Sequence, residues 1–371
     1  MKKIDKPIFV TRPSLPPLED FVECLKELWE TKWLTHDGRF HKEFEKAICE
    51  YLDIDYCTLF CNGTLALQAA LAILNLEGEV ITTPFTFAAT ANAIVLSGLK
   101  PVFVDIDPDT FNISPESIRK AVTDKTSAIM PVHVYGNPCD TMAIDAIADQ
   151  YNLKVIYDGA HAFGVKQEGA SILSAGDMTM VSFHATKIMN SIEGGAIITN
   201  NSEYKRKLDL FRFYGLSGET STELIGTNAK MNEVQAAMGL LNLRNIDDNI
   251  ACRRALAEKY RELLADVDGI KVLNDFPGVR HNYAYFPILV DEKRYGMSRD
   301  ELCDKLKEHN IFARRYFYPL LTDFSAYNDS NCRIEELPVA KRTAKQVLCL
   351  PLHTELTEEQ IRQILENIAS V

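Results

Sequence analysis

The stretch Val155-Ile156-Tyr157-Asp158-Gly159-Ala160-His161 brings three apolar residues directly up to a carboxylate. A short apolar run that ends before a glycine is typical of a buried strand, and Asp158 would then stand at the end of that strand. A buried carboxylate needs a cation or several hydrogen-bond donors. Its chemical use would be to hold a protonated ring nitrogen, which makes a pyridine an electron sink. An ordinary helix N-cap would explain the same residue equally well.

Similar apolar runs flank this stretch and alternate with helical patterns from about residue 50 to residue 200. Runs that are apolar throughout suit strands covered on both faces, so the alternation predicts an α/β fold with a mostly parallel, seven-stranded sheet. The predicted strands are Tyr56–Phe60, Glu79–Thr82, Lys100–Val104, Ala128–His133, Lys154–Tyr157, Met178–Phe183 and Ala196–Thr199. The predicted helices are Thr64–Leu74, Ala88–Leu96, Pro115–Val122, Thr141–Tyr151 and Tyr204–Phe213.

The pattern changes after Asn228 and predicts a smaller α+β domain at the end of the chain. We expect a large domain over residues 1–240, with an N-terminal arm, and a small domain over residues 241–371. No Pro/Gly linker marks the boundary. The elements predicted there are a long helix Val234–Leu264, a strand Tyr283–Val290, a helix Ser298–His309, a strand Ile311–Arg315 and a terminal helix Thr357–Ser370.

A second stretch, Val181-Ser182-Phe183-His184-Ala185-Thr186-Lys187, places a lysine just past an apolar strand and before the pair Gly194-Gly195. A desolvated lysine amine gains access to its neutral, nucleophilic form, which Schiff-base chemistry requires. Without further context, a solvated surface lysine is the commoner explanation. His184 is either catalytic or a neighbour that packs beside a cofactor or bonds to the backbone.

Two further segments combine glycine with polar side chains at predicted helix starts. Cys61-Asn62-Gly63-Thr64 follows a strand, so its glycine and free N–H groups could approach an anion, although an ordinary N-cap fits as well. Gly226 to Glu233 precedes the long helix and has the composition of a turn and cap, with Asn232 or Asn228 starting the helix. By itself it suggests no catalytic use.

The composition excludes several classes of protein. The 371 residues carry a formal charge of −12, which argues against a nucleic-acid-binding surface. The nine cysteines include no CxxC pair, so neither a disulfide framework nor a metal site is expected. The N-terminus has no signal-peptide pattern and no apolar run is long enough to span a membrane, so we expect a cytoplasmic protein. No GxGxxG follows the first strand, which disfavours a Rossmann dehydrogenase.

Taken together, these segments resemble the DegT/DnrJ/StrS family of sugar aminotransferases, which depend on pyridoxal phosphate (PLP) and belong to the fold-type I enzymes. The likeness runs over nearly the whole chain. It includes Phe40-His41-Lys42-Glu43-Phe44-Glu45, the stretch from Val80 to Ala93 with Thr86-Phe87-Ala88-Ala89-Thr90, and Leu350-Pro351-Leu352-His353. The resemblance implies that the large domain binds PLP.

The resemblance also implies roles around the cofactor ring. Lys187 would bind PLP covalently and, once released by the incoming amine, move protons at the substrate carbon. Asp158 would pair with the pyridinium nitrogen, and His161 would approach the phenolic oxygen of the cofactor. Phe87 would stack on the ring. A subset of the family has histidine in place of the lysine and performs dehydration, so the presence of Lys187 favours transamination.

The cofactor phosphate would lie against Gly63, Thr64 and Ser182, with Asn228 reaching in from a second subunit. The resemblance therefore implies a homodimer with two shared active sites. Two positions depart from the family pattern. Asn62 stands where a small residue is common, and Gly159 stands where alanine is more usual, which would leave slightly more room under the ring.

The resemblance supports weaker assignments on the substrate side. The segment Ile311 to Leu320 occupies the place of a His-Tyr-x-Pro-Leu segment at the mouth of the site but contains no histidine. Guanidinium groups suit phosphate oxygens, although surface salt bridges explain arginines equally well. Trp33 either lines the neighbouring subunit's site or anchors the core of its own chain. The candidate substrate-binding residues are Trp33, His184, Arg314, Arg315, Tyr316 and Tyr318.

The implied reaction is the transfer of an amino group from L-glutamate to a nucleotide-linked keto sugar, a step in deoxyamino sugar and polysaccharide biosynthesis. The segment around Lys187 resembles that of the 4-aminotransferases acting on dTDP-4-keto-6-deoxyglucose, with dTDP-4-amino-4,6-dideoxyglucose as product. The alternatives are a 3-aminotransferase, a UDP-sugar 4-aminotransferase and a PLP-dependent sugar dehydratase. A regulatory protein that keeps the fold without turnover is a further alternative, disfavoured by the absence of a DNA-binding module.

Overall fold

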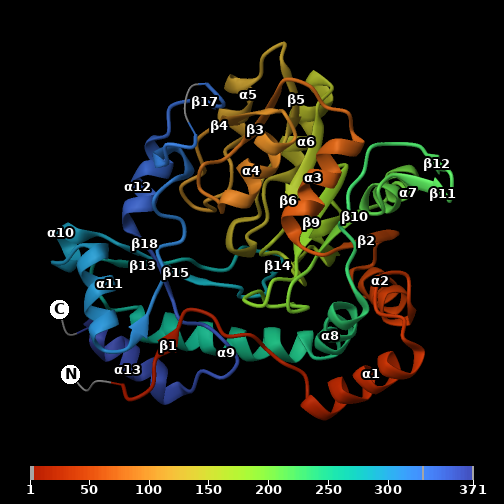
Figure 1. Cartoon of the computed structure of the whole chain (residues 1–371). Helices are drawn as coiled ribbons and strands as arrows, with labels where there is room; N and C mark the ends of the chain where they lie inside the picture. Colours follow the sequence, from red (N-terminus) through yellow and green to blue (C-terminus); the bar gives the residue numbers. More distant parts are fainter. Residues whose placement is uncertain (1–3, 328–329, 370–371) are drawn as a thin grey trace.

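The fold is built on a mixed eight-stranded sheet with the strand order β17-β4-β3-β5-β6-β9-β10-β2 (Figure 1). The computed structural model describes residues 4–327 and 330–369. Strand β10 is antiparallel to both of its neighbours, whereas the other pairs in the sheet are parallel. The bounds are β2 (Tyr56–Phe60), β3 (Glu79–Thr82), β4 (Lys100–Phe103), β5 (Thr126–Ile129), β6 (Lys154–Asp158), β9 (Met178–Ser182), β10 (Gly195–Thr199) and β17 (Arg333–Ile334).

Two features of this sheet differ from the prediction. The edge strand β17, only two residues long, adds an eighth strand to the seven predicted. Strand β5 ends at Ile129 and not at His133. Pro131 follows, and a proline has no N–H to donate to a strand neighbour. Beyond it only an isolated bridge joins Val132 to Asp158, so the chain leaves the sheet beside the carboxylate that ends β6.

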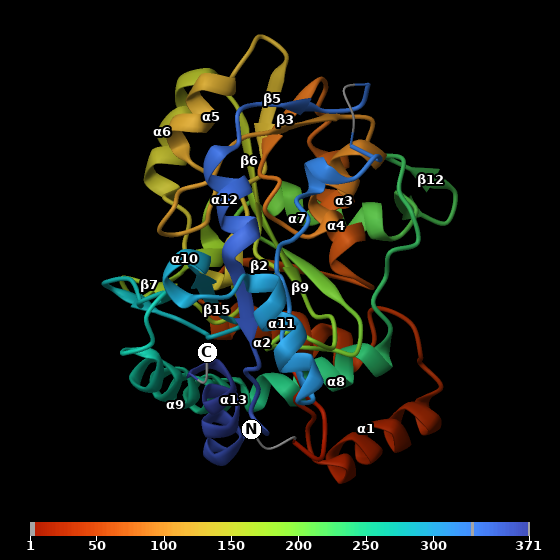
Figure 2. The ribbon, with the colours of Figure 1, turned by 90° about the vertical axis from the view of Figure 1, so that its left-hand side faces the viewer.

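Helices cover both faces of the sheet because its strands are apolar on both sides. In β10, Ala196 and Ile198 pack into one core and Ile197 packs into another, as the alternation of side chains in a strand requires. Figure 2 shows α5 and α6 on one side of the sheet and α3, α4 and α7 on the other. The helices are α3 (Gly63–Ile73), α4 (Ala88–Leu96), α5 (Pro115–Ala121), α6 (Thr141–Tyr151), α7 (Ser202–Arg212) and, over β2, α2 (Arg39–Leu52).

The predicted long helix Val234–Leu264 is two helices, so this prediction was wrong. Asn245 leaves the helical conformation, with φ −107° and ψ 9°. Because of this break, α8 (Glu233–Arg244) and α9 (Ile246–Leu264) contribute to different hydrophobic cores. Helix α8 packs with α2 beside the large sheet, whereas the later turns of α9 pack into a separate core near the chain end.

That second core surrounds a three-stranded sheet with the order β13-β15-β18. The predicted strand Tyr283–Val290 is shorter, and the predicted strand Ile311–Arg315 keeps only β16, which pairs with β1 near the N-terminus. The predicted domain division at residue 240 falls inside α8 and stays a prediction. The elements are β13 (Ile270–Val272), β15 (Phe286–Val290), β18 (Val347–Leu350), α11 (Arg299–Glu308), α13 (Glu358–Ala369), β16 (Ile311–Phe312) and β1 (Ile8–Phe9).

Among residues 4–327 and 330–369, no helix combines the length and the apolar character needed to cross a membrane.

Candidate active site

Asp158 lies in the interior at the end of β6, with an exposed fraction of 4%. Its Oδ2 accepts a hydrogen bond of 2.7 Å from the Thr90 hydroxyl, and its Oδ1 accepts one of 3.0 Å from the Ala160 N–H. Burial raises the pKa of Asp158, while Thr90, Ala160 and the nearby Lys187 lower it. The carboxylate is thus hydrogen-bonded but only partly compensated in charge.

Lys187 lies in the loop between β9 and β10, where its N–H donates to the His184 carbonyl at 2.9 Å. Its Nζ lies 5.9 Å from the centre of the Tyr285 ring. Burial lowers the pKa of Lys187, while Asp158 and Tyr316 raise it. Because β6 and β9 are parallel neighbours, the residues that follow them meet at one edge of the sheet. A lysine with a lowered pKa at this place is suited to nucleophilic chemistry.

His161 is held in a defined orientation by an aromatic cluster. Its Nδ1 accepts a 3.1 Å hydrogen bond from the Tyr135 N–H. Burial, followed by the charge of Lys187, holds the pKa of His161 well below its usual range, so the ring is neutral and Nε2 carries its proton. The rings of Tyr135 and Phe317 lie nearly parallel to it, and Tyr285 meets its edge. Nε2 can therefore donate to a phenolate oxygen.

The turn that opens α3 has the features of an anion site. Asn62 is the N-cap: its Oδ1 accepts from the Leu65 N–H at 2.9 Å, and its backbone oxygen accepts from Ala66. Within the described part of the chain, the N–H groups of Gly63 and Thr64 have no protein acceptor. The N-terminus of this helix thus keeps two donors free for an anion. Asn62, which stands where the resemblance leads us to expect a small residue, therefore caps helix α3.

Gly63 lies where the backbone of two strands comes close. A Cβ on Gly63 would stand 3.3 Å from the Ser182 Cβ, and a Cβ on Gly195 would stand 2.6 Å from the Gly63 nitrogen. Gly195 therefore requires glycine, which explains one member of the Gly194-Gly195 pair, whereas a Cβ on Gly63 would make a tight contact. Gly159 is also required by the fold. A Cβ there would stand 2.7 Å from the Leu173 Cδ2 and 2.9 Å from the Met180 oxygen. The extra room that it would leave under a ring stays a prediction.

Asn228 lies close to this turn but is exposed. The Cys61 N–H donates to the Ala229 oxygen at 2.9 Å, which places the segment beside the anion turn of its own chain. Helix α8 starts at Asn232, whose side chain forms a capping box with Gln235, so Asn228 is not the helix start. The contact of Asn228 with a second subunit stays a prediction.

Phe87 is the N-cap residue of α4 and is 64% exposed. An exposed phenylalanine on the helix that also carries Thr90 is available to a ligand. Its stacking role stays a prediction.

The substrate-side candidates differ in how they are held. Tyr316 lies close enough to Lys187 for the two to influence each other's pKa, and its backbone oxygen accepts from the Tyr135 hydroxyl. Arg315 forms an ion pair of 2.7 Å with Asp300. Arg314 is exposed, with its guanidinium carbon 5.9 Å from the Tyr316 ring centre. Tyr318 is 42% exposed and lies against Arg315.

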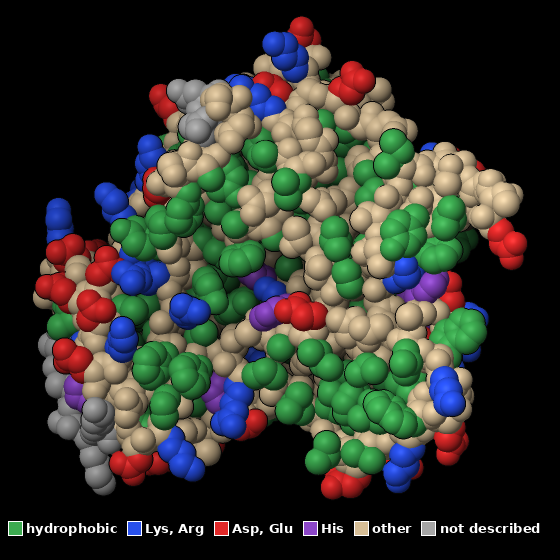
Figure 3. All heavy atoms as spheres, viewed as in Figure 1, with side chains coloured by type: hydrophobic (Ala, Val, Ile, Leu, Met, Phe, Trp, Pro, Cys, Tyr) green, Lys and Arg blue, Asp and Glu red, His purple; other side chains and the backbone are tan. Residues whose placement is uncertain are grey.

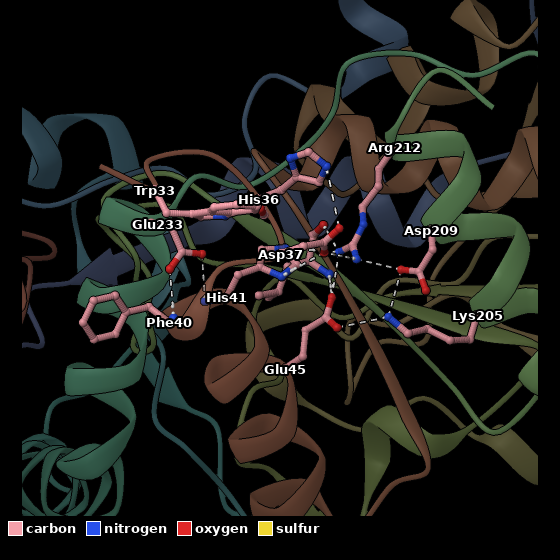
Figure 4. A network of polar contacts seen from close by, with 11 residues as sticks. Trp33, His36, Asp37, Phe40, His41, Glu45, Lys205, Asp209, Arg212 and Glu233 are labelled. Carbon is pink, nitrogen blue, oxygen red and sulfur yellow. Dashed lines mark hydrogen bonds and ion pairs between the residues drawn. The ribbon is translucent and has the colours of Figure 1, made fainter. Parts of the chain in front are cut away.

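Trp33 is 56% exposed, so the reading of Trp33 as a core anchor of its own chain was wrong. Its indole N–H donates to the His36 carbonyl at 2.9 Å, beside a cluster of charged residues around Arg212 (Figure 4). The His184 Nδ1 accepts from the Thr186 N–H at 3.2 Å, and its Nε2 lies 3.5 Å from Glu193. Their substrate contacts stay predictions.

Three residues of this site escaped the sequence reasoning. Thr90 and Tyr135 contact Asp158 and His161 from segments far away in the chain, and Tyr285 faces the Lys187 amine. Their contacts join segments that are separate in the sequence, so no local pattern marks these residues.

The donor set fits PLP. A lysine with a lowered pKa suits its aldehyde, a buried carboxylate suits its ring nitrogen, a neutral histidine suits its phenolic oxygen, and a helix N-terminus suits its phosphate.

Residues 18–369 match the DegT/DnrJ/EryC1/StrS aminotransferase family. Similar proteins include a dTDP-4-amino-4,6-dideoxy-D-glucose transaminase of Shigella dysenteriae, 50% identical over 99% of this chain and 100% of that protein. A transaminase of the same name from Escherichia coli is 44% identical over 97% of each chain. A crystal structure of DesI in the presence of its TDP-sugar product is 34% identical, with a TM-score of 0.95 over 100% of this chain and 94% of that one. The predicted fold-type I architecture is thereby confirmed.

Proposed function

Because the chain belongs to the DegT/DnrJ/EryC1/StrS aminotransferase family, we propose that it transfers the amino group of L-glutamate to C4 of dTDP-4-keto-6-deoxyglucose, with PLP held at Lys187. The product would be dTDP-4-amino-4,6-dideoxyglucose. The observation that carries the proposal is that the Lys187 amine, with its lowered pKa, lies close enough to the buried Asp158 carboxylate for each charge to influence the pKa of the other. The names of the two transaminases, at 50% and 44% identity, support the choice of substrate.

PLP, when bound, supplies an electron sink for the carbon next to the amino group. With PLP bound, the negative charge of Asp158 would favour a proton on the ring nitrogen, and His161 could donate from Nε2 to the phenolic oxygen. Gly63, Thr64 and Ser182 would hold the phosphate. Together these residues would bind and orient the cofactor.

Lys187 moves the protons in both half-reactions. Released by the incoming amine, it takes the proton from the α-carbon of L-glutamate as a general base. In the second half it returns a proton to C4 of the sugar as a general acid. Its lowered pKa favours the neutral form that the first of these steps requires.

We propose a homodimer with shared active sites. Hydrophobic side chains gather on the lower right of the face in Figure 3, where Figure 1 draws α1 (Leu18–Thr31) and α8. The exposed large apolar residues on and beside α1 are Leu15, Leu18, Val22, Trp29, Trp33 and Leu34. A second copy would cover such a surface. A cytoplasmic location stays a prediction as well.

The experiment supplies the protein with PLP, L-glutamate and a panel of dTDP- and UDP-linked 4-keto sugars, and follows 2-oxoglutarate formation. Product mass and NMR then locate the new amine. We expect an amine at C4 of the dTDP-linked sugar. An amine at C3, a preference for UDP-linked sugars, or a dehydrated product without 2-oxoglutarate would each overturn the proposal.

The variant Lys187→Ala isolates the role of the amine. It should abolish turnover and the absorbance band of lysine-bound PLP, because no other group in the proposed mechanism can bind the aldehyde covalently. Lys46→Ala, which removes an amine from a lysine that is 76% exposed, is the matched control and should leave both unchanged.

A further inference from the structure

Two threonines form a hydrogen-bond relay behind the Asp158 carboxylate. The Thr86 and Thr90 hydroxyl oxygens lie 2.9 Å apart, and the Thr90 hydroxyl lies 2.7 Å from Asp158 Oδ2. All three residues are buried, with exposed fractions of 4% or less. Thr90 belongs to α4 and Thr86 to the loop before it, whereas Asp158 ends β6 on a different part of the chain.

The charge of Asp158 gives this relay a direction. An ionised carboxylate can only accept, so the single hydroxyl proton of Thr90 goes to Asp158. The Thr90 oxygen must then accept from Thr86, which leaves Thr86 as the donor at the outer end. A threonine in a helix commonly gives its hydroxyl proton to a carbonyl of the preceding turn. Thr90 instead gives it to the carboxylate.

We infer that Thr90 is a positioning residue for the reaction, supported by Thr86: it orients the Asp158 carboxylate and keeps it ionised opposite the ring nitrogen of PLP. The inference rests on the proposed function. With Oδ2 bonded to Thr90 and Oδ1 bonded to Ala160, each oxygen keeps a lone pair for an N–H donor. Phe87 lies between Thr86 and Thr90, so the start of α4 would position both the residue predicted to stack on the ring and the Asp158 carboxylate.

The other groups around Asp158 do not take over this task. Lys187 faces it from the β9–β10 loop and is the amine that leaves when substrate enters. His161 is neutral, and the buried Cys139 near β5 has a pKa raised well above its usual value by burial, so it carries no charge. Within the described residues, the hydrogen-bond donors to the Asp158 carboxylate are thus the Thr90 hydroxyl and the Ala160 N–H, and Lys187 acts on it through its charge.

The test uses the holoenzyme with PLP labelled with nitrogen-15 in the ring, and the variants Thr90→Val, Thr90→Ser and Thr86→Val. The ring-nitrogen chemical shift is followed from about pH 6 to about pH 9, a range in which a weakened carboxylate partner would release the proton. Values of kcat and KM are measured in parallel. Thr58→Val is the matched control, because Thr58 is also fully buried but its hydroxyl has no partner within the described residues.

In Thr90→Val we expect the ring nitrogen to lose its proton at a lower pH than in the wild type. A hydrogen bond to a charged group corresponds to a fall in kcat of about tenfold to a hundredfold, with little change in KM. Thr90→Ser should restore both readouts, and Thr86→Val should shift both in the same direction by a smaller factor. Thr58→Val should match the wild type.

A ring-nitrogen titration in Thr90→Val that is identical to the wild type would overturn the inference, whatever happens to kcat. If Thr90→Val does not fold, Thr86→Val decides: an unchanged titration there overturns the relay, and a lowered one supports it. Failure of the wild type to bind PLP would instead overturn the proposed function, and the inference with it.

Discussion

Two carboxylates of the molecule lie in contrasting surroundings: the buried Asp158 at the candidate site and the partly buried Glu45 on α2. Glu45, 17% exposed at its side chain, lies 2.6 Å from Arg212 and 3.1 Å from Lys205 (Figure 4). Burial would raise its pKa, but Arg212 and Lys205, with smaller contributions from His41 and the Leu59 N–H, lower it to about 2. Asp158 has hydroxyl and backbone donors and a lysine with a lowered pKa, and its own pKa is raised.

The surroundings of Glu45 and Asp158 differ in the source of the compensating positive charge. Around Glu45 the protein supplies it in full: Arg212 also contacts Asp209 at 2.8 Å and the Leu59 oxygen at 3.0 Å, joining α2, α7 and β2. Such a cluster favours one packing arrangement of these elements. Around Asp158 the compensation is incomplete, and a cationic ring would complete it. An interior charge that is fully paired holds the fold, whereas one left partly unpaired is available for chemistry.

Asp158→Asn should give the largest effect. Removing the charge opposite the ring nitrogen should lower kcat by about a thousandfold or more, equivalent to about 4 kcal/mol of barrier. Because the pKa of Asp158 is raised by burial, the apo variant should be no less stable than the wild type. Steady-state kinetics and urea unfolding measure the two quantities. A kcat within about tenfold of the wild type would contradict the comparison.

Arg212→Met should give the second-largest effect. In contrast to Asp158→Asn, it should lower the stability of the fold and leave catalysis nearly unchanged. It leaves Glu45 and Asp209 without their shared cation, and breaking a buried ion pair in this way lowers the free energy of unfolding by about 3–5 kcal/mol. The kcat per folded molecule should change little, because Arg212 contacts none of the proposed cofactor residues. Urea unfolding checks the first expectation. A stable variant with lost activity would reverse the assignment of the two regions.

His41 should make the Glu45 region sensitive to acid. Its buried ring accepts from Arg212 at 3.3 Å, and burial, then Arg212, lowers its pKa to about 4. The unfolded chain takes up this proton near pH 6.5, so the contribution is present above about pH 6.5 and is lost as the pH falls toward 4. His41→Gln should remove about 3 kcal/mol of that pH-dependent loss. An unchanged profile of unfolding free energy against pH would contradict the prediction.

The smallest effect should come from an exposed ion pair. Arg254 and Glu258 on α9 lie 2.9 Å apart with side chains 62% and 57% exposed. Glu258→Gln should lower the free energy of unfolding by no more than about 0.5 kcal/mol, and less in high salt. Urea unfolding at two salt concentrations measures this. A loss comparable to that of Arg212→Met would show that burial is not what separates the two regions.

The sequence predicted those parts of the fold that local patterns determine. Helices α4 and α6 and strands β2 and β3 have the predicted bounds, because their apolar runs end at capping or turn residues. Asp158 and Lys187 could each be placed at a strand end, and parallel pairing of β6 with β9 brings those ends together. The roles assigned to both residues stay predictions.

The remaining features depend on contacts between distant segments. Thr90 lies 68 residues from Asp158, and within its own helix it has the pattern of any buried position. The break at Asn245 follows from the two cores that α8 and α9 must reach, and the sequence between them is helical in character throughout. The edge strand β17 is too short to give a pattern. Tertiary packing decides all three.

The antiparallel pairing of β9 with β10 has a consequence for engineering. The connection that carries Lys187 leaves the sheet at Ser182 and returns at its direct partner Gly195, so its two ends are clamped side by side. Because both ends of this loop are fixed, an inserted or deleted residue would change the position of the Lys187 amine. Libraries should therefore hold the length of residues 183–194 constant and vary length in the exposed turn between β11 (Leu216–Gly218) and β12 (Ser221–Thr222), where extra residues extend into solvent.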